Sequence, residues 1–220
     1  MRFRRYGAFS SVIYRAFIDP VLCSLRSKVL HVCLKRHIGS ALDIATATGA
    51  QCRRLGTAGI ETVGLDLSEA MIAAAREHRA RNVEYVVGSA YELPFQDASF
   101  DAALLTLALH EHTETERASM ISEALRIVKH DGYVVLADYS MPAKPLLHLA
   151  WQVICLIEYL AGPEHRTGFR EFIAYGGITG LLTRYGLEAQ EIVHSHFGTI
   201  AIAVIHGNRT PESDINDGVA

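Results

Sequence analysis

The run Ala41–Ala50 constrains the fold of this chain more than any other stretch. It begins as a short apolar segment, Ala41 to Ala45, which is typical of a buried strand. Small residues and Gly49 follow, and a helix-like stretch runs over Gly49–Leu55. Such a turn lets the backbone approach a ligand, and the helix N-terminus offers N–H groups to a negative group. The same pattern also fits a turn that serves packing only.

Strand and helix patterns then alternate along the chain, which predicts parallel βαβ units and a doubly wound α/β sheet. A later pair of strands, joined at Phe197-Gly198, predicts an antiparallel hairpin at the end of the sheet. The predicted strands are Ala41–Ala45, Glu61–Asp66, Val83–Val87, Asp101–Leu107, Tyr133–Asp138, Glu188–His194 and Thr199–His206, and the predicted helices are Gly49–Leu55, Ser68–Arg79, Thr115–Val128, Leu146–Leu160 and Arg170–Tyr185.

Length and composition favour one domain with a sizeable core. The chain has 220 residues, half of them hydrophobic, and a net charge of -3, which argues against a nucleic-acid partner. Its four cysteines show neither metal spacing nor a disulfide framework, so we expect a reducing compartment, the cytoplasm. No stretch reaches the roughly 18 uninterrupted apolar residues of a membrane-spanning helix.

We expect three parts: a helical cap over residues 1–38, a catalytic domain over 39–206 and a flexible tail over 207–220. The cap contains a helical pattern, Tyr6–Val32, interrupted at Asp19-Pro20, and its first residues are basic and aromatic. Three interpretations stay open: a helix packed on the domain, a lid over a site, or weak contact with an anionic membrane surface.

Two carboxylates stand out near strand ends, where a doubly wound sheet binds its ligand. Asp66 follows the first turn by roughly twenty residues, the spacing at which an acid accepts both hydroxyls of a ribose. Asp43 lies inside a strand, where an unpaired carboxylate is costly. We expect backbone N–H groups of the turn, or a cationic ligand group, to compensate it.

The motifs between about Ala41 and Asp138 match those of a known family in continuous order. The chain resembles class I S-adenosylmethionine-dependent methyltransferases, and it is similar to the small-molecule branch near the ubiquinone and menaquinone enzymes. The motifs are Leu42-Asp43-Ile44-Ala45 with Gly49, Gly64-Leu65-Asp66-Leu67-Ser68 with Met71, Leu93-Pro94-Phe95 with Ser99-Phe100-Asp101, and Leu125-Arg126-Ile127-Val128-Lys129 with Gly132. The resemblance implies a mostly parallel seven-stranded sheet of order 3-2-1-4-5-7-6.

The resemblance also implies S-adenosylmethionine as cofactor and a role for each residue around it. Asp66 would bind the ribose, with Leu67, Met71, Ser89 and Ala90 around the adenine. Ala45, Thr46, Ala47 and Gly49 would wrap the methionine portion, with Thr106 and Leu107 around its carboxyl side, and Asp43 is a further cofactor-binding candidate. Three departures from the family pattern are Ala45 and Ala47 in place of glycines, Ser89 in place of an acid, and Lys129-His130-Asp131-Gly132 in place of Lys-Pro-Gly-Gly.

Methyl transfer from a sulfonium depends mostly on positioning, and a base is needed only when the acceptor begins protonated. Candidates for such a base are His110, Glu111 and His165, since Leu-His-Glu after the fourth strand resembles the quinone-type branch. We expect no metal ion. The side chains of adjacent residues in the run His110-Glu111-His112 would point in different directions, and no third ligand is evident.

The segment 145–177 is expected to be a helical lid that sets specificity. Its apolar face and the basic, aromatic N-terminus favour a small, lipophilic or lipid-like acceptor. Two rival functions stay open: an NAD(P)-dependent oxidoreductase on a Rossmann-type sheet, although a full Gly-x-Gly-x-x-Gly is missing, and a cofactor-binding protein without catalysis. The oligomeric state is left open.

Overall fold

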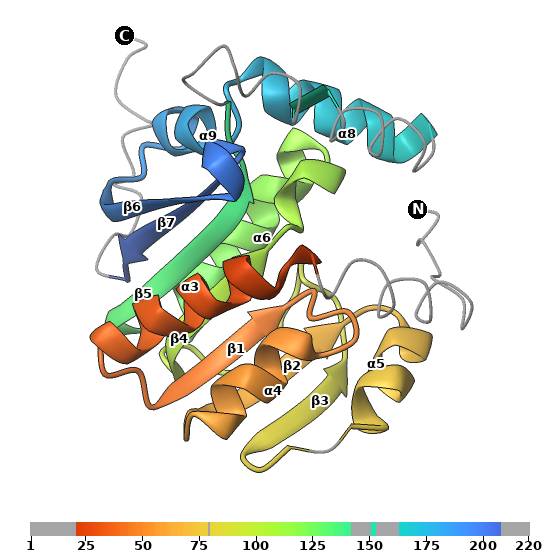
Figure 1. The fold of residues 1–220 in the computed structure, drawn as a ribbon, viewed down its shortest axis with the longest axis vertical. Helices are drawn as coiled ribbons and strands as arrows, with labels where there is room; N and C mark the ends of the chain where they lie inside the picture. The colour runs from red at the N-terminus through yellow and green to blue at the C-terminus, as the bar shows by residue number, and fades with distance from the viewer. Residues whose placement is uncertain (1–20, 79, 142–150, 153–162, 208–220) are drawn as a thin grey trace, which may run out of the picture.

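The computed structural model describes residues 21–78, 80–141, 151–152 and 163–207, whose strands form one seven-stranded sheet (Figure 1). The order is β3-β2-β1-β4-β5-β7-β6, as predicted. β1 to β5 run parallel, and β7 lies antiparallel between β5 and β6, which confirms the predicted hairpin. The strands are β1 (Ser40–Ile44), β2 (Glu61–Asp66), β3 (Val83–Val87), β4 (Phe100–Thr106), β5 (Val128–Tyr139), β6 (Ala189–Ser195) and β7 (Ile200–His206).

Two helices begin at residues whose side chains cap them, and the Ser68 cap is the one that the sequence predicts. The Ser68 hydroxyl accepts a hydrogen bond from the Met71 N–H at 3.3 Å and caps α5. Thr113 and Glu116 form a reciprocal capping box at the start of α6. The helices are α3 (Cys23–Lys35), α4 (Ala50–Thr57), α5 (Glu69–Arg76), α6 (Glu114–Ile127), α8 (Pro163–Ala174) and α9 (Ile178–Arg184), with 3₁₀ turns η2 (Leu109–Glu111) and η4 (His196–Gly198).

Two apolar cores, one on each face of the sheet, hold the layers together. One core packs α3 and Leu55 of α4 against the strands, and the other packs α6, α8 and α9 against the opposite face. Figure 1 shows α3 and α4 in front of the sheet and α6 behind it. β7 contributes side chains to both cores, because successive residues of the strand point to opposite faces of the sheet.

The prediction of a single helix over Arg170–Tyr185 is wrong. The chain leaves helical geometry at Gly176 and Gly177, whose φ angles are 92° and 67°. At Gly177 an added Cβ would lie 2.3 Å from the carbonyl oxygen of Tyr139, so the break lets the backbone pass close to the end of β5. Two helices, α8 and α9, therefore replace the one predicted.

The fifth strand also begins earlier than predicted. It starts at Val128 rather than Tyr133, and its register against β4 shifts between Phe100 and Ala102. The expected helix Leu146–Leu160 lies almost wholly outside the described residues, of which only Trp151 and Gln152 fall within it. The first part of the helical cap, residues 1–20, and the tail after Gly207 also lie outside them. The three-part division therefore stays a prediction.

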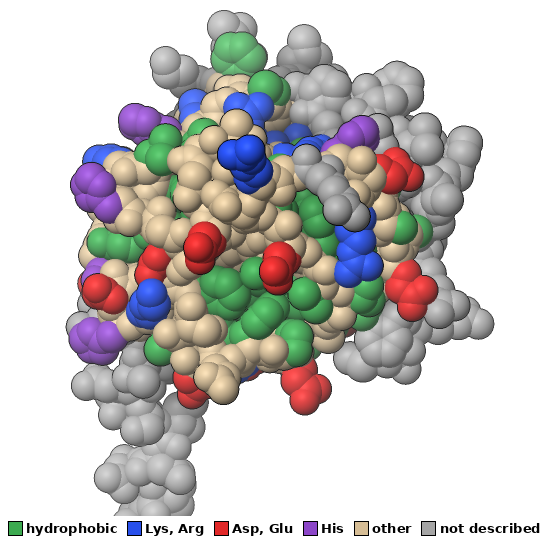
Figure 2. All heavy atoms as spheres, turned by 90° about the horizontal axis from the view of Figure 1, so that it is seen from below, with side chains coloured by type: hydrophobic (Ala, Val, Ile, Leu, Met, Phe, Trp, Pro, Cys, Tyr) green, Lys and Arg blue, Asp and Glu red, His purple; other side chains and the backbone are tan. Residues whose placement is uncertain are grey.

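Parallel strands bring their carboxyl ends to one edge of the sheet, which is where the predicted site residues lie. Figure 2 looks at the molecule from below, away from this edge. On that face the acidic and basic side chains stand apart around a group of hydrophobic ones.

Candidate cofactor and acceptor site

The turn between β1 and α4 is built from left-handed backbone. Ala45, Ala47 and Gly49 have φ angles of 59°, 50° and 73°. This region suits glycine, and an alanine there is held at a cost of about 1–2 kcal/mol. The surrounding structure therefore imposes a glycine-type turn on two alanines, which explains why the family pattern prefers glycine at these positions.

A side chain at Gly49 would have to displace the Tyr85 side chain, and it would sit on left-handed backbone. An added Cβ would lie 2.3 Å from the hydroxyl oxygen of Tyr85 on β3. That hydroxyl donates a hydrogen bond to the Gly49 carbonyl oxygen at 3.3 Å. Tyr85 thus holds the last residue before α4 in place.

Asp43 is buried beneath this turn and is compensated by side chains. Its Oδ2 accepts hydrogen bonds from the Thr46 hydroxyl and from the Cys52 thiol, the latter at 3.3 Å. The described contacts to Asp43 therefore come from side chains instead of the expected backbone N–H groups, and the expected alternative, a cationic ligand group, stays a prediction. Burial raises the pKa of Asp43 to about 6, although both hydrogen bonds and the Arg26 charge oppose the rise.

Asp66 joins the loops that leave the first two strands. Its Oδ2 accepts the Ala47 N–H at 2.9 Å, and its Oδ1 accepts the Ser68 N–H at 2.9 Å. Burial raises the pKa of this carboxyl, and the two backbone N–H groups counter the rise. A carboxylate has about four lone-pair sites, so these two hydrogen bonds leave capacity for two more donors.

Two exposed apolar side chains, Leu67 and Val87, lie near Asp66 at the carboxyl edge. Leu67 and Val87 are 41% and 42% exposed at the ends of β2 and β3. Beyond β3 the Ser89 hydroxyl accepts the Tyr91 N–H at 3.2 Å, and Ala90 is half-buried. Met71 is buried within α5 instead of facing solvent. A flat apolar group could lie against Leu67, and the adenine roles of these residues stay predictions.

The end of β4 carries an unusual polar atom. Thr106 Oγ1 is buried and has no hydrogen-bond partner within the described part of the chain. The same is true of both amide atoms of Gln51, in the first turn of α4, which the sequence patterns did not single out. Leu107 follows in left-handed geometry, at φ 53°. Orphaned polar atoms are costly, and those beside a binding turn are candidates to face a ligand.

His110 lies in η2, past the end of β4, and is paired with Asp138 at the end of β5. The His110 Nδ1 and Asp138 Oδ1 atoms are 2.8 Å apart, and both residues are buried. The Asp138 carboxylate also accepts the backbone N–H groups of Leu109, His110 and Tyr139. One carboxylate thus fixes both the η2 backbone and the His110 ring.

Aromatic rings surround this histidine. The Tyr139 ring lies 4.7 Å from the His110 ring, and the Phe169 ring of α8 lies 6.2 Å from it. Trp151 packs against Tyr139 and Phe169 at 6.1 and 6.2 Å. The sequence patterns did not single out Phe169, which stands between Gly168 and Arg170 in the predicted lid.

Of the other two acid–base candidates, the structure describes the side chain of Glu111 but not that of His165. Glu111 Oε1 lies 4.0 Å from His110 Nε2, so these two are brought together. His165 lies in the first turn of α8, and its side chain is outside the described residues. His112 turns away to Tyr91, whose hydroxyl lies 2.9 Å from the His112 Nδ1.

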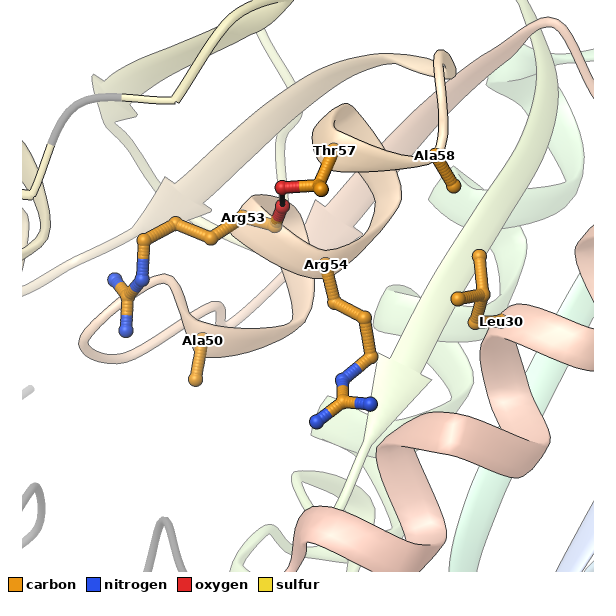
Figure 3. Close-up of a pocket in the computed structure, with 6 residues that line it drawn as sticks. All are labelled: Leu30, Ala50, Arg53, Arg54, Thr57 and Ala58. Atoms are coloured by element: carbon orange, nitrogen blue, oxygen red, sulfur yellow. Dashed lines mark hydrogen bonds between the residues drawn. The ribbon is translucent and has the colours of Figure 1, made fainter.

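A separate groove lies on the outer face of α4 and not at the carboxyl edge. It is lined by Leu30, Ala50, Arg53, Arg54, Thr57 and Ala58 (Figure 3). Arg53 donates to the Thr48 carbonyl oxygen at 2.6 Å, and Arg54 donates to the Ser27 hydroxyl at 2.8 Å. Because both guanidinium groups bind the protein itself, the groove is not the site that the sequence predicts.

The comparisons with known proteins agree with this geometry. Residues 42–136 match the family described as a methyltransferase domain. This part of the chain is similar to a methyltransferase domain, and it contains most of β1, all of β2 to β4, the turn, Asp66 and His110. The sheet order is the one that the resemblance implies.

Curated relatives of the methyltransferase domain are named for a quinone. A demethylmenaquinone methyltransferase from Paenarthrobacter aurescens is 34% identical over 105 residues, which cover 48% of this chain and 40% of that protein. One from Thermotoga maritima is 34% identical over 119 residues, which cover 53% of this chain and 51% of that protein. The matched part is about half the length of these curated relatives.

Solved structures share the fold over most of the chain. Protein PH0226 from Pyrococcus horikoshii has a TM-score of 0.65 at 22% identity and covers 88% of this chain and 97% of its own. An S-adenosylmethionine-dependent methyltransferase from Aquifex aeolicus has a TM-score of 0.60 at 18% identity, covering 91% and 100%. At these identities the likeness concerns the fold alone.

S-adenosylmethionine is the methyl donor of this class, and the residues present fit it. Asp66 has lone pairs to spare for ribose hydroxyls, and Leu67 offers apolar surface for a base. The turn between β1 and α4 has only small side chains at Ala45, Ala47 and Gly49, which suits the amino-acid arm, and Thr106 Oγ1 is a polar atom without a partner among the described residues. No feature of the described edge conflicts with this cofactor.

Proposed function

We propose that this chain transfers a methyl group from S-adenosylmethionine to a small, lipophilic acceptor. The observation that carries the proposal is the convergence of two loops on one carboxylate, since Asp66 binds both Ala47 and Ser68 through their N–H groups. Bound there, S-adenosylmethionine would supply a methyl group on a cationic sulfur with a neutral leaving group. Asp66 would hold its ribose, and Thr46, Ala47 and Gly49 would border its amino-acid arm.

The acceptor side of the proposal is supported by the rings around His110. Tyr139, Phe169 and Trp151 form an apolar wall next to a histidine that is oriented by Asp138. Such a wall excludes water and favours a flat, lipophilic partner over a polar polymer. The names of the curated relatives point the same way, since they name demethylmenaquinone.

A lipophilic acceptor would bring the protein close to a membrane surface from the cytoplasm. Among the described residues no helix is long and apolar enough to cross a membrane. We propose that the basic, aromatic segment that begins Met1-Arg2-Phe3-Arg4-Arg5 makes a weak, electrostatic contact with anionic lipid. Co-sedimentation with anionic vesicles that fails on replacing the three arginines by glutamate would support it, and no difference from neutral vesicles would refute it.

The rival functions have less support. An NAD(P)-dependent oxidoreductase leaves the match of residues 42–136 to a methyltransferase domain unexplained. A protein that binds the cofactor without catalysis would have no use for an oriented histidine at the acceptor side. Both alternatives predict no transfer of a methyl label.

The direct test uses S-adenosylmethionine with a labelled methyl group, a total lipid extract and a panel of naphthols, amines and phospholipids. We expect label to appear in the organic phase with the wild-type chain and to fall sharply with Asp66→Asn. Asp131→Asn, an exposed carboxyl away from the carboxyl edge, is the matched control and should transfer normally. Binding of S-adenosylhomocysteine without transfer to any acceptor would favour the non-catalytic alternative.

A further inference from the structure

We propose that Tyr85 and Arg53 are positioning residues for the cofactor, because they hold the turn between β1 and α4 in the left-handed backbone that its alanines disfavour. The inference rests on the proposed function, since this turn would border the amino-acid arm of S-adenosylmethionine. Tyr85 belongs to β3, at the edge of the sheet, and Arg53 belongs to α4, so neither lies in the turn itself. The sequence patterns singled out neither residue.

The turn has a conformation that its own residues disfavour. Ala45 and Ala47 have φ angles of 59° and 50°, where the Cβ of an L-residue crowds a carbonyl oxygen. Glycine would adopt these angles without that cost. Contacts from outside the turn therefore have to hold it. Asp66 provides one of them, because its Oδ2 accepts the Ala47 N–H at 2.9 Å.

Tyr85 reaches the turn from two strands away. Asp43, Gly64 and Tyr85 stand opposite one another on β1, β2 and β3. A Cβ on Gly64 would lie 2.8 Å from the Tyr85 ring, so the missing side chain lets that ring lie across β2. The Tyr85 hydroxyl then donates to the Gly49 carbonyl oxygen at 3.3 Å. Burial raises the pKa of this hydroxyl to about 12, so it keeps its proton and remains a donor at neutral pH.

Arg53 holds the preceding residue of the turn. Its guanidinium donates to the Thr48 carbonyl oxygen at 2.6 Å, a charge-assisted hydrogen bond. Figure 3 shows that Arg53 and Arg54 leave α4 in different directions. Arg54 donates to the Ser27 hydroxyl of α3 at 2.8 Å. Arg53 therefore acts on the turn, and its neighbour acts on the packing of α3 against α4.

The two contacts fix consecutive peptide groups directly after Ala47. Because a peptide group is planar, a held carbonyl also sets the direction of the next N–H group. The Thr48 carbonyl thus directs the Gly49 N–H, which closes the turn on the Thr46 carbonyl oxygen at 3.0 Å. The Gly49 carbonyl directs the Ala50 N–H, the first of α4. Such N–H groups suit a negative group, here the carboxylate of the cofactor's arm, and their preorganisation lowers the entropy that binding loses.

Tyr85→Phe removes the hydroxyl and keeps the ring over Gly64. We expect isothermal titration to show S-adenosylhomocysteine binding about 3 to 10-fold weaker, the usual worth of one hydrogen bond. Arg53→Gln removes the contact to Thr48, and we expect at least as large a loss, because its hydrogen bond is charge-assisted. Urea titrations should show that both chains are folded.

The decisive measurement repeats Tyr85→Phe in the Ala47→Gly background. Glycine has no preference against the left-handed region, so the turn there needs the hydroxyl less. We expect Tyr85→Phe to weaken S-adenosylhomocysteine binding in this background by less than about 2-fold. A hydroxyl that contributes only to the stability of the fold would give the same effect in both backgrounds.

Two substitutions are matched controls. Tyr133→Phe removes a hydroxyl from a half-buried tyrosine of β5 that pairs with Ala102, near the start of β4. Arg54→Gln removes a charge from α4 directly beside Arg53. We expect both chains to bind S-adenosylhomocysteine like the wild type.

Several results would overturn the inference. Unchanged affinity in a folded Tyr85→Phe or Arg53→Gln chain would remove that residue from the positioning role. An equal loss from Tyr85→Phe with and without Ala47→Gly would show that the hydroxyl does not act through the turn. A loss with Arg54→Gln as large as with Arg53→Gln would assign the effect to net charge. Failure of the wild-type chain to bind S-adenosylhomocysteine would refute the proposed function instead.

Discussion

At the scale of single residues, the site depends on carboxylates that accept backbone N–H groups at strand ends. Asp66 joins the first two loops, and Asp138 joins the ends of β4 and β5. The sequence spacing predicted the position of Asp66, because the acid follows a turn of recognisable composition. It could not predict that Thr46 and Cys52 hold Asp43, since side-chain contacts across a turn depend on its exact dihedral angles.

Replacing Asp66 tests the cofactor site. Asp66→Ala should weaken S-adenosylhomocysteine binding by about 1–3 kcal/mol, because the ribose hydroxyls lose a partner. The loss of the Ala47 contact adds to the effect by loosening the turn. Isothermal titration measures it, with Asp131→Ala as a control that should bind like the wild type. Unchanged affinity in a folded Asp66→Ala chain would remove Asp66 from the site.

Asp43 should give the folded protein a specific pH dependence. Its pKa of about 6 in the fold lies above its usual value, because burial disfavours the charge. Its favourable contribution is therefore complete at acid pH, below its unfolded pKa, and is lost as the pH rises through about 6. Asp101 and Glu191 have lowered pKa values and act in the opposite direction, so only a difference isolates Asp43.

That difference is the free energy of unfolding of the wild type minus that of Asp43→Asn. Urea titrations without cofactor should show it falling by up to about 3 kcal/mol between pH 4 and pH 7. A flat difference would mean that the carboxyl is hydrated or better paired than the fold indicates.

At the scale of elements, α8 is fixed closely to the loop that carries His110. Arg117 of α6 is buried, donates to Glu171 of α8 at 2.9 Å and to the His112 carbonyl oxygen at 2.9 Å. The periodicity of the sequence predicted one helix where the structure has α8 and α9. Glycines also occur inside helices, so the break at Gly176 and Gly177 becomes evident only from the close approach of β5. The contact of α8 with η2 joins segments far apart in sequence, and no local pattern predicts it.

Gly168 permits this approach of α8. An added Cβ would lie 2.7 Å from the Glu111 carbonyl oxygen and 3.0 Å from that of His110. Gly168→Ala should therefore destabilise the fold by about 1–3 kcal/mol through crowding, although helix propensity alone would favour alanine by up to about 1 kcal/mol. Urea unfolding measures the change, and exposed Arg170→Ala on the same helix should have little effect. A stabilised Gly168→Ala chain would show that α8 does not press on η2.

At the scale of the whole molecule, the sheet order was predictable. Alternating strands and helices predict a parallel sheet, and the motif resemblance implies the order of its strands, with β7 between β5 and β6. The structure adds that β7 contributes to both cores, since Ile200 to Ile205 are all buried. The hairpin thus completes the domain.

Two truncated chains compare how much the hairpin and the tail contribute to the stability of the fold. A chain that ends after Gly186 loses β6 and β7, exposes the edge of β5 and removes apolar side chains from both cores, so we expect no cooperative unfolding transition. A chain that ends after Gly207 keeps every described element and should unfold like the full sequence. Near-ultraviolet circular dichroism with urea titration checks both. A cooperative transition in the shorter chain would show that β1 to β5 fold alone.

The most direct test of the cofactor site is a crystal structure with S-adenosylhomocysteine. We predict the ribose hydroxyls on the Asp66 carboxylate, the adenine against Leu67, and the amino-acid arm above the turn from Ala45 to Gly49. An adenosyl group bound at any other edge of the sheet, or a nicotinamide nucleotide that binds at this turn in its place, would contradict the assignment.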